Sequence, residues 1–147
     1  MNLHGPLVHV PSKKVLVNTL VVGAQNCEMH WQSDGNYLAV LLDQSSERHP
    51  SAYINIAIFE LKKPHIPVEF FEFERESKIV AFAWEPKGHR FGVIQGLTPY
   101  SGELTFYDVD LLQVLATKKT MAMNIQWNPT GRFVATRCPP FSKKKMD

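Results

Sequence analysis

The chain has 147 residues, of which 44% are hydrophobic and 20% charged, and its formal net charge is +2. A chain of this length and composition can bury a sizeable core in a single domain. The weak positive charge is not by itself typical of a nucleic-acid-binding protein. The two cysteines, Cys27 and Cys138, lack metal-ligand spacing, and no apolar run of membrane-spanning length occurs. These features argue against a disulfide framework, a metal site and a membrane segment, and we expect a soluble, cytoplasmic protein.

Alternating apolar residues bounded by turn signals predict β-strands throughout, and no stretch has a helical period. The first twelve residues are mixed and contain two prolines, and 15–22 is expected to be the outer strand of a preceding unit. The expected strands of the first complete unit are 27–31, 37–42, 54–60 and 68–73, with a polar loop over 43–51. Those of the second unit are 80–84, 91–94, 104–109 and 113–116. The strands 123–127 and 133–136 form a single hairpin of a third unit.

Three tryptophans mark an internal repeat with a period of about 40 to 55 residues: Trp31, Trp84 and Trp127. Each has an apolar residue two positions before it, a glycine four after it, an apolar residue seven after it and a small residue eight after it. The glycines are Gly35, Gly88 and Gly131, and the small residues are Ala39, Gly92 and Ala135. Repeats of this length with several short strands are typical of β-propeller blades.

We therefore predict an all-β fold, a partial WD40-like β-propeller with about two full four-stranded blades and a half blade. A β-sandwich with similar hairpins recurring by chance is the alternative, and the matched columns in three copies argue against it. Propellers need at least about four blades to close, so we expect an arc of a larger closed propeller. Residues 1–136 are assigned to the propeller and 137–147 to an irregular basic tail, in which Lys143–Lys145 is expected to be solvated.

The repeat segments resemble the propeller of the b subunit of eukaryotic translation initiation factor three. The segments that carry the resemblance are Val21–Leu38, Pro64–Glu69, Ile79–Gly88 and Ile125–Val134. The resemblance implies a non-catalytic scaffold without cofactor, metal, membrane or small-molecule substrate. Its implied partners are the other subunits of the complex and the small ribosomal subunit, including rRNA and ribosomal proteins. The alternatives are the propeller of the initiation factor called two-A and an unrelated WD-type platform for protein–protein interaction.

Basic side chains are expected to gather where the first and third hairpin turns of each blade emerge on one face. The candidate binding residues are Lys62, Lys63, His65, Lys87, His89, Arg90 and Arg132. Such a rim can make charge-assisted contacts with rRNA phosphates or an acidic protein surface. The alternative is that these are ordinary solvated turn residues. The tryptophans and the repeat glycines are interpreted as structural core.

Enzyme chemistry is not predicted. The chain has no Gly-x-Ser-x-Gly elbow, no phosphate-cradling glycine loop and no His-x-x-x-His pair. The six histidines are spread one to a region, and His30, next to a repeat tryptophan, is expected to be a hydrogen-bonded interior histidine.

Overall fold

A computed structural model describes residues 2–22, 26–43, 54–73, 77–98 and 101–140. These residues form strands and turns, with no helix among them. The chain divides into two compact units, Met1–Arg75 and Glu76–Asp147, and each is described by itself.

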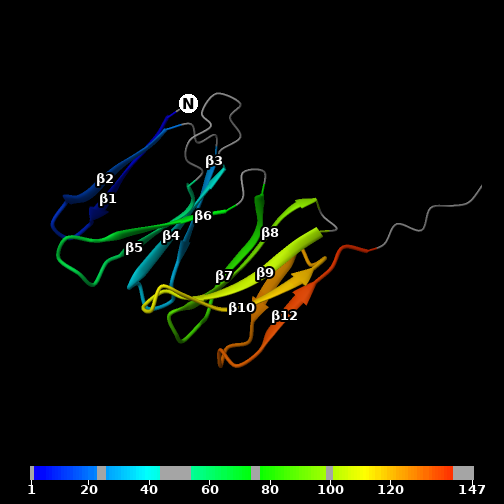
Figure 1. Cartoon of the computed structure of the whole chain (residues 1–147). Helices are drawn as coiled ribbons and strands as arrows, with labels where there is room; N and C mark the ends of the chain where they lie inside the picture. The colour runs from blue at the N-terminus through cyan, green and yellow to red at the C-terminus, as the bar shows by residue number, and fades with distance from the viewer. Residues whose placement is uncertain (1, 23–25, 44–53, 74–76, 99–100, 141–147) are drawn as a thin grey trace, which may run out of the picture. The chain divides into compact units, whose positions relative to one another are not determined.

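The first unit holds a two-stranded hairpin and a four-stranded antiparallel sheet (Figure 1). The hairpin pairs β1 (Asn2–His9) with β2 (Lys14–Val22). The sheet pairs its strands in chain order: β3 (Asn26–Trp31), β4 (Tyr37–Asp43), β5 (Ile54–Glu60) and β6 (Val68–Glu72). Its two middle strands are the most buried because both edges are covered by neighbouring strands. Leu38, Ala57, Phe59 and Ile66 form a core cluster, against which Leu7 of β1 packs.

The second unit repeats this four-stranded sheet and adds one more hairpin (Figure 1). The sheet consists of β7 (Lys78–Trp84), β8 (Arg90–Thr98), β9 (Ser101–Asp108) and β10 (Gln113–Thr120). The hairpin pairs β11 (Asn124–Trp127) with β12 (Val134–Arg137). A core cluster of Ile94, Leu104, Ala122 and Ile125 lies between the sheet and the hairpin.

The small column of the repeat is the seat for the next hairpin. A Cβ added at Gly92 would lie 3.0 Å from the Phe106 ring and 3.5 Å from Ile125 Cδ1, so only a small residue lets Ile125 approach β8. Beside it, Trp127 Nε1–H donates to the Ala83 carbonyl at 3.1 Å. The repeat tryptophan of a hairpin is thus hydrogen-bonded to the preceding blade, one residue before the tryptophan of that blade.

The predicted strands of both four-stranded units are confirmed, with β7, β8 and β10 longer than expected. The exception is β1, which the mixed composition and Pro6 concealed. Pro6 is tolerated because β1 is an edge strand in the described sheet, where an absent N–H need not break a ladder. Residues 44–51 of the expected polar loop and residues 141–147 of the expected basic tail lie outside the described residues.

Two features of the repeat depart from expectation. Gly88 does not have a positive φ, unlike Gly35 (φ 74°) and Gly131 (φ 72°), so it does not serve its turn through left-handed backbone geometry. Trp31 is not part of the described core, because 56% of its surface is exposed. The physical reason is that Trp31 lies on β3, an edge strand of its sheet, whereas Trp127 is covered by β7.

Candidate functional site

The inner and outer turns of each sheet meet on one face. Leu61 N–H donates to the Asn36 carbonyl at 2.9 Å in the first unit, and Val109 N–H donates to the His89 carbonyl at 2.9 Å in the second. These equivalent bonds fasten the β5–β6 turn to the β3–β4 turn, and the β9–β10 turn to the β7–β8 turn. Basic residues predicted on these two kinds of turn therefore share a face within each unit.

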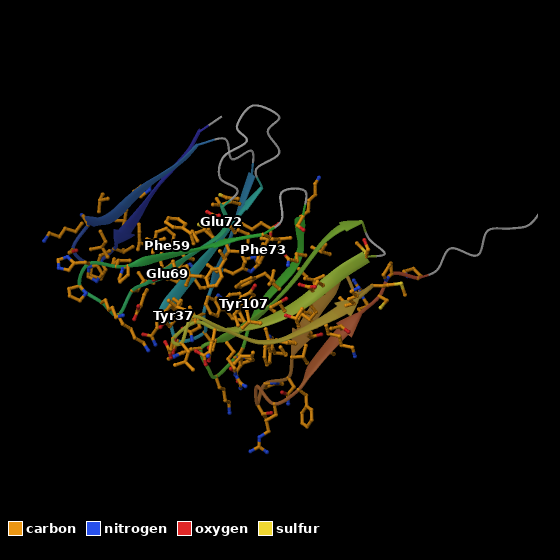
Figure 2. The ribbon with its side chains drawn as sticks, in the orientation of Figure 1. Tyr37, Phe59, Glu69, Glu72, Phe73 and Tyr107 are labelled. Carbon is orange, nitrogen blue, oxygen red and sulfur yellow. The ribbon has the colours of Figure 1, made fainter. Side chains whose placement is uncertain are left out.

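The β5–β6 turn carries Lys62, Lys63 and His65, all of them exposed. Lys63 Nζ lies 3.0 Å from Glu60 Oε2 and is neutralised by it. Lys62 Nζ lies 5.8 Å from the centroid of the Tyr37 ring, a cation–π distance that holds the ammonium at the surface. Figure 2 labels Tyr37 together with Phe59, which belongs to the core under this turn.

The β7–β8 turn is organised by Glu85, a carboxylate only 4% exposed. Glu85 accepts hydrogen bonds from both Nε (2.6 Å) and Nη2 of Arg90. This partner, more than burial, determines the pKa of the Arg90 guanidinium, which is raised above its ordinary value. Arg90 is therefore held by an internal carboxylate, and we assign it to the fold instead of to a binding surface.

Glu85 also joins two turns. A Cβ added at Gly88 would lie 2.3 Å from Glu85 Oε2, and one added at Gly131 would lie 2.5 Å from Oε1. The carboxylate thus occupies the space that two glycines leave, one from its own turn and one from the β11–β12 turn. Gly88 is required for this space and not for its φ, which explains why the same column serves two purposes.

Of the remaining basic candidates in the second unit, His89 pairs through Nδ1 with Asp110 Oδ2. Lys87 and Arg132 are exposed, and no carboxylate within the described residues forms an ion pair with either. Because Glu85 holds their two turns together, Lys87 and Arg132 form a pair of cations on one face, which we call the Lys87–Arg132 rim.

The residue directly after each repeat tryptophan was overlooked in the sequence, although the column is polar in all three copies: Gln32, Glu85 and Asn128. Gln32 is only 2% exposed. Asn128 Oδ1 accepts from the backbone N–H groups of Arg132 and Phe133, both at 3.0 Å, and so closes the β11–β12 turn. A polar residue in the same place of each copy was the available signal.

The aromatic residues of the second unit pack against one another. Phe91 stacks on Phe82 (5.1 Å between centroids) and on Tyr107 (5.0 Å), and Trp84 meets Phe91 edge-on at 5.4 Å. Burial, with a further effect of Glu103, raises the pKa of Tyr107 above its ordinary value. Trp127 lies edge-on to Phe106 at 5.6 Å. Trp84 and Trp127 are thus packing residues, while His30, half-buried, contacts Glu28 at 3.3 Å.

Among the described residues no three His, Cys, Asp or Glu side chains are grouped as metal ligands would be. In the same part of the chain, no helix is long and apolar enough to cross a membrane.

Residues 20–138 match the family model described as eukaryotic translation initiation factor eIF2A. The chain belongs to the eIF2A family. The match covers most of the chain and includes all three repeat tryptophans.

Curated relatives of this eIF2A-family chain are named as the b subunit of eukaryotic translation initiation factor 3. The Arabidopsis thaliana protein is 40% identical over 87% of the chain and 19% of its own length. The Nicotiana tabacum protein is 30% identical over 88% of the chain and 25% of its own length. The chain thus spans about a fifth to a quarter of these relatives, and the resemblance to this component of the factor is confirmed. The two-A factor named as an alternative gives its name to the matching family model, so the two interpretations share one domain type.

Solved structures confirm the fold class. Kuenenia stuttgartiensis hydrazine synthase matches 93% of the chain and 49% of its own length, with a TM-score of 0.61 and 17% identity. The Dos1 propeller matches 92% of the chain and 36% of its own length, with a TM-score of 0.52 and 14% identity. At such low identity the likeness concerns the fold alone, a partial β-propeller.

Proposed function

We propose that the chain is a propeller segment of a non-catalytic scaffold protein in the cytoplasmic translation initiation factor three complex. In this role it contacts the small ribosomal subunit and sister subunits during initiation. The observation that carries the proposal is the 40% identity to a protein named as a component of that factor, over 87% of the chain.

The chemistry of the turns supports a binding role. The Lys87–Arg132 rim presents two exposed cations on turns fixed by the buried Glu85, so little side-chain support has to be ordered on binding. Lys62 presents a third cation in the first unit. Cations of this kind gain affinity for rRNA phosphates through charge-assisted contacts and the release of counterions.

The same turns give little support to catalysis. Their most buried carboxylate, Glu85, is held by Arg90, and His89 is paired with Asp110. Acid–base catalysis needs a group that can exchange its proton with a substrate, and these groups are engaged in internal pairs. A scaffold role therefore fits the described polar residues better than an enzyme role.

The first prediction tests the rim. Lys87→Gln combined with Arg132→Gln is expected to weaken co-sedimentation of the chain with purified small ribosomal subunits. If both residues contact phosphates, the slope of log K against log salt concentration should fall by about two, one for each contact. The measurement is a binding curve at three or more salt concentrations.

The matched control removes the same charge elsewhere in the second unit. Lys118→Gln combined with Lys119→Gln changes two exposed lysines of β10, and binding is expected to remain at the wild-type level. Equal loss in both double variants would indicate a general charge effect and contradict the rim. No association of the wild-type chain with the small ribosomal particle would contradict the ribosomal role and favour a platform for other proteins.

A further inference from the structure

The first hairpin of the chain has the geometry of the outer half of a blade. The loops of β1–β2 and β9–β10 span 10–13 and 109–112, and each ends in a left-handed residue, Lys13 (φ 56°) and Leu112 (φ 50°). Each hairpin also has a register shift at the same place, past Val15 in β2 and past Val114 in β10. Three matching irregularities identify β1 and β2 as the third and fourth strands of a blade.

The last hairpin has the geometry of an inner half. In the β11–β12 turn, Gly131 N–H donates to the Asn128 carbonyl at 3.0 Å and Asn128 N–H donates to the Phe133 carbonyl at 2.9 Å. The β3–β4 turn has the same two bonds at Gly35 and Gln32, both at 3.0 Å. In the described residues β11 and β12 are thus the first and second strands of a blade whose outer strands are absent.

The two half-blades are complementary. In the complete sheets the second strand pairs with the third, with Tyr37 opposite Glu60 and Arg90 opposite Asp108. Transferred through the repeat, this register places Phe133 of β12 opposite His9 of β1. It also places Val134 opposite Val8 and Thr136 opposite Pro6. We propose that β12 of one copy pairs in this register with β1 of a second copy, so that two half-blades become one four-stranded blade.

The backbone groups at the two edges support this register. Phe133 and Arg137 direct their carbonyls to β11, accepting from Asn128 (2.9 Å) and Met123 (2.8 Å). Because backbone groups alternate along a strand, Val134 and Thr136 direct theirs to the open edge. By the same rule Val8 faces the open edge of β1. Pro6 can accept a bond there from Thr136 but cannot donate one.

Exposed apolar side chains lie where the joined blade would cover them. Val10 is 78% exposed, whereas its equivalent Val109 is 4% exposed because the inner turn of its own blade covers it. Trp31 and Met29 of β3 are 56% and 67% exposed. Trp127 bonds to Ala83, the residue before Trp84, and the equivalent partner for Trp31 is the carbonyl of Gln126 in the second copy.

The partner is a second copy and not the other end of the same copy. Joining the two ends of one copy would close a ring of only three blades, fewer than the four to eight that propellers typically contain. Pairing between copies is head-to-tail, and such contacts form rings when the rotation closes. The inference is independent of the ribosomal role, because it rests on the strand edges alone.

The test uses the full chain with one edge blocked at a time. Val8→Pro removes the N–H that β1 offers, and Thr136→Pro removes one that β12 offers. The wild-type chain is expected to associate with increasing concentration in light scattering coupled to size exclusion, and each variant alone should remain a single copy. An equimolar mixture of the two variants should form a dimer of one of each, because each keeps one competent edge.

A second measurement does not depend on a tolerated proline. His9→Cys and Phe133→Cys place thiols on residues expected to lie opposite each other at a pair not joined by backbone bonds, where cross-strand Cβ atoms come closest. With Cys138→Ser in both chains, the mixture should give a disulfide-linked heterodimer on oxidation. His9→Cys mixed with Lys118→Cys of β10 is the matched control and should not. A wild-type chain that stays single at all concentrations, or cross-linking equal to the control, would overturn the proposal.

Discussion

At the scale of single residues, the repeat glycines act in two different ways. Gly35 and Gly131 both have positive φ, which costs other residues about 1–2 kcal/mol. Gly131 also faces the Glu85 carboxylate, whereas a Cβ at Gly35 would meet nothing within 4 Å. The two positions therefore separate the cost of backbone geometry from the cost of packing.

Gly131→Ala is accordingly expected to destabilise the protein more than Gly35→Ala. Both carry the left-handed cost, and Gly131→Ala must in addition displace Glu85, for which overpacking of about 1–3 kcal/mol is typical. Urea unfolding of the two variants measures the difference directly. Equal losses would show that Glu85 moves aside freely and does not fix the two turns.

Tyr107 gives a prediction for alkaline pH. Burial raises the pKa of its phenol in the folded protein, so the stability that this shift contributes is complete below the unfolded pKa of about 10. That contribution is lost as the pH rises through the higher folded value. Tyr107→Phe removes the titrating group, so its urea midpoint should change differently from that of the wild type between pH about 8 and about 10.5. An identical pH dependence would contradict the assignment.

The sequence predicted the glycine and tryptophan columns but not their partners. The pattern showed that Gly88 and Gly131 were required, and turn chemistry suggested positive φ for both. Only the structure shows that Glu85 fills the space beside them, because contacts between neighbouring blades are not visible in a single repeat.

At the scale of elements, one tryptophan ties a hairpin to the preceding sheet. β11 and β12 form only four paired positions, and a two-stranded hairpin is marginal on its own. The hairpin is held by the apolar contact of Ile125 over Gly92 and by the Trp127–Ala83 hydrogen bond. Its stability therefore depends on the preceding blade more than on its own ladder.

Trp127→Phe keeps most of the aromatic contact and removes the N–H donor. The expected loss is about 1–2 kcal/mol, with faster hydrogen exchange confined to β11 and β12. Leu111→Ala, at a side chain 65% exposed in the same unit, is the control and should leave exchange in these strands unchanged. Unchanged exchange in Trp127→Phe would show that apolar packing alone holds the hairpin.

Strand prediction succeeded where alternation was strong and failed where it was broken. The strands around Ile56 and Val93 alternate or are continuously apolar, and their central positions are buried in the structure. β1 was missed because Pro6 ordinarily ends a strand and its neighbours are mixed. An edge strand escapes both rules, since one side of its backbone needs no partner and one face needs no core.

At the scale of the whole molecule, the repeat was sufficient to predict a propeller and the family. The basic rim was only partly predictable, because three of its seven members were found in ion pairs: Lys63, His89 and Arg90. Carboxylates that neutralise a cation come from residues as far apart as His89 and Asp110. Sequence shows which charges a turn carries, but only the fold shows which of them remain available.

The order in which the strands pair has a consequence for synthesis of the chain. In both four-stranded sheets each strand pairs with the one that directly follows it, so every ladder joins residues made within a short time of each other. Contacts between nearby residues form quickly, and domains fold from the N-terminus as they emerge from the ribosome. Each sheet can therefore be complete before the next begins. The bond from Trp127 back to Ala83 then docks a new hairpin onto a blade that is already folded.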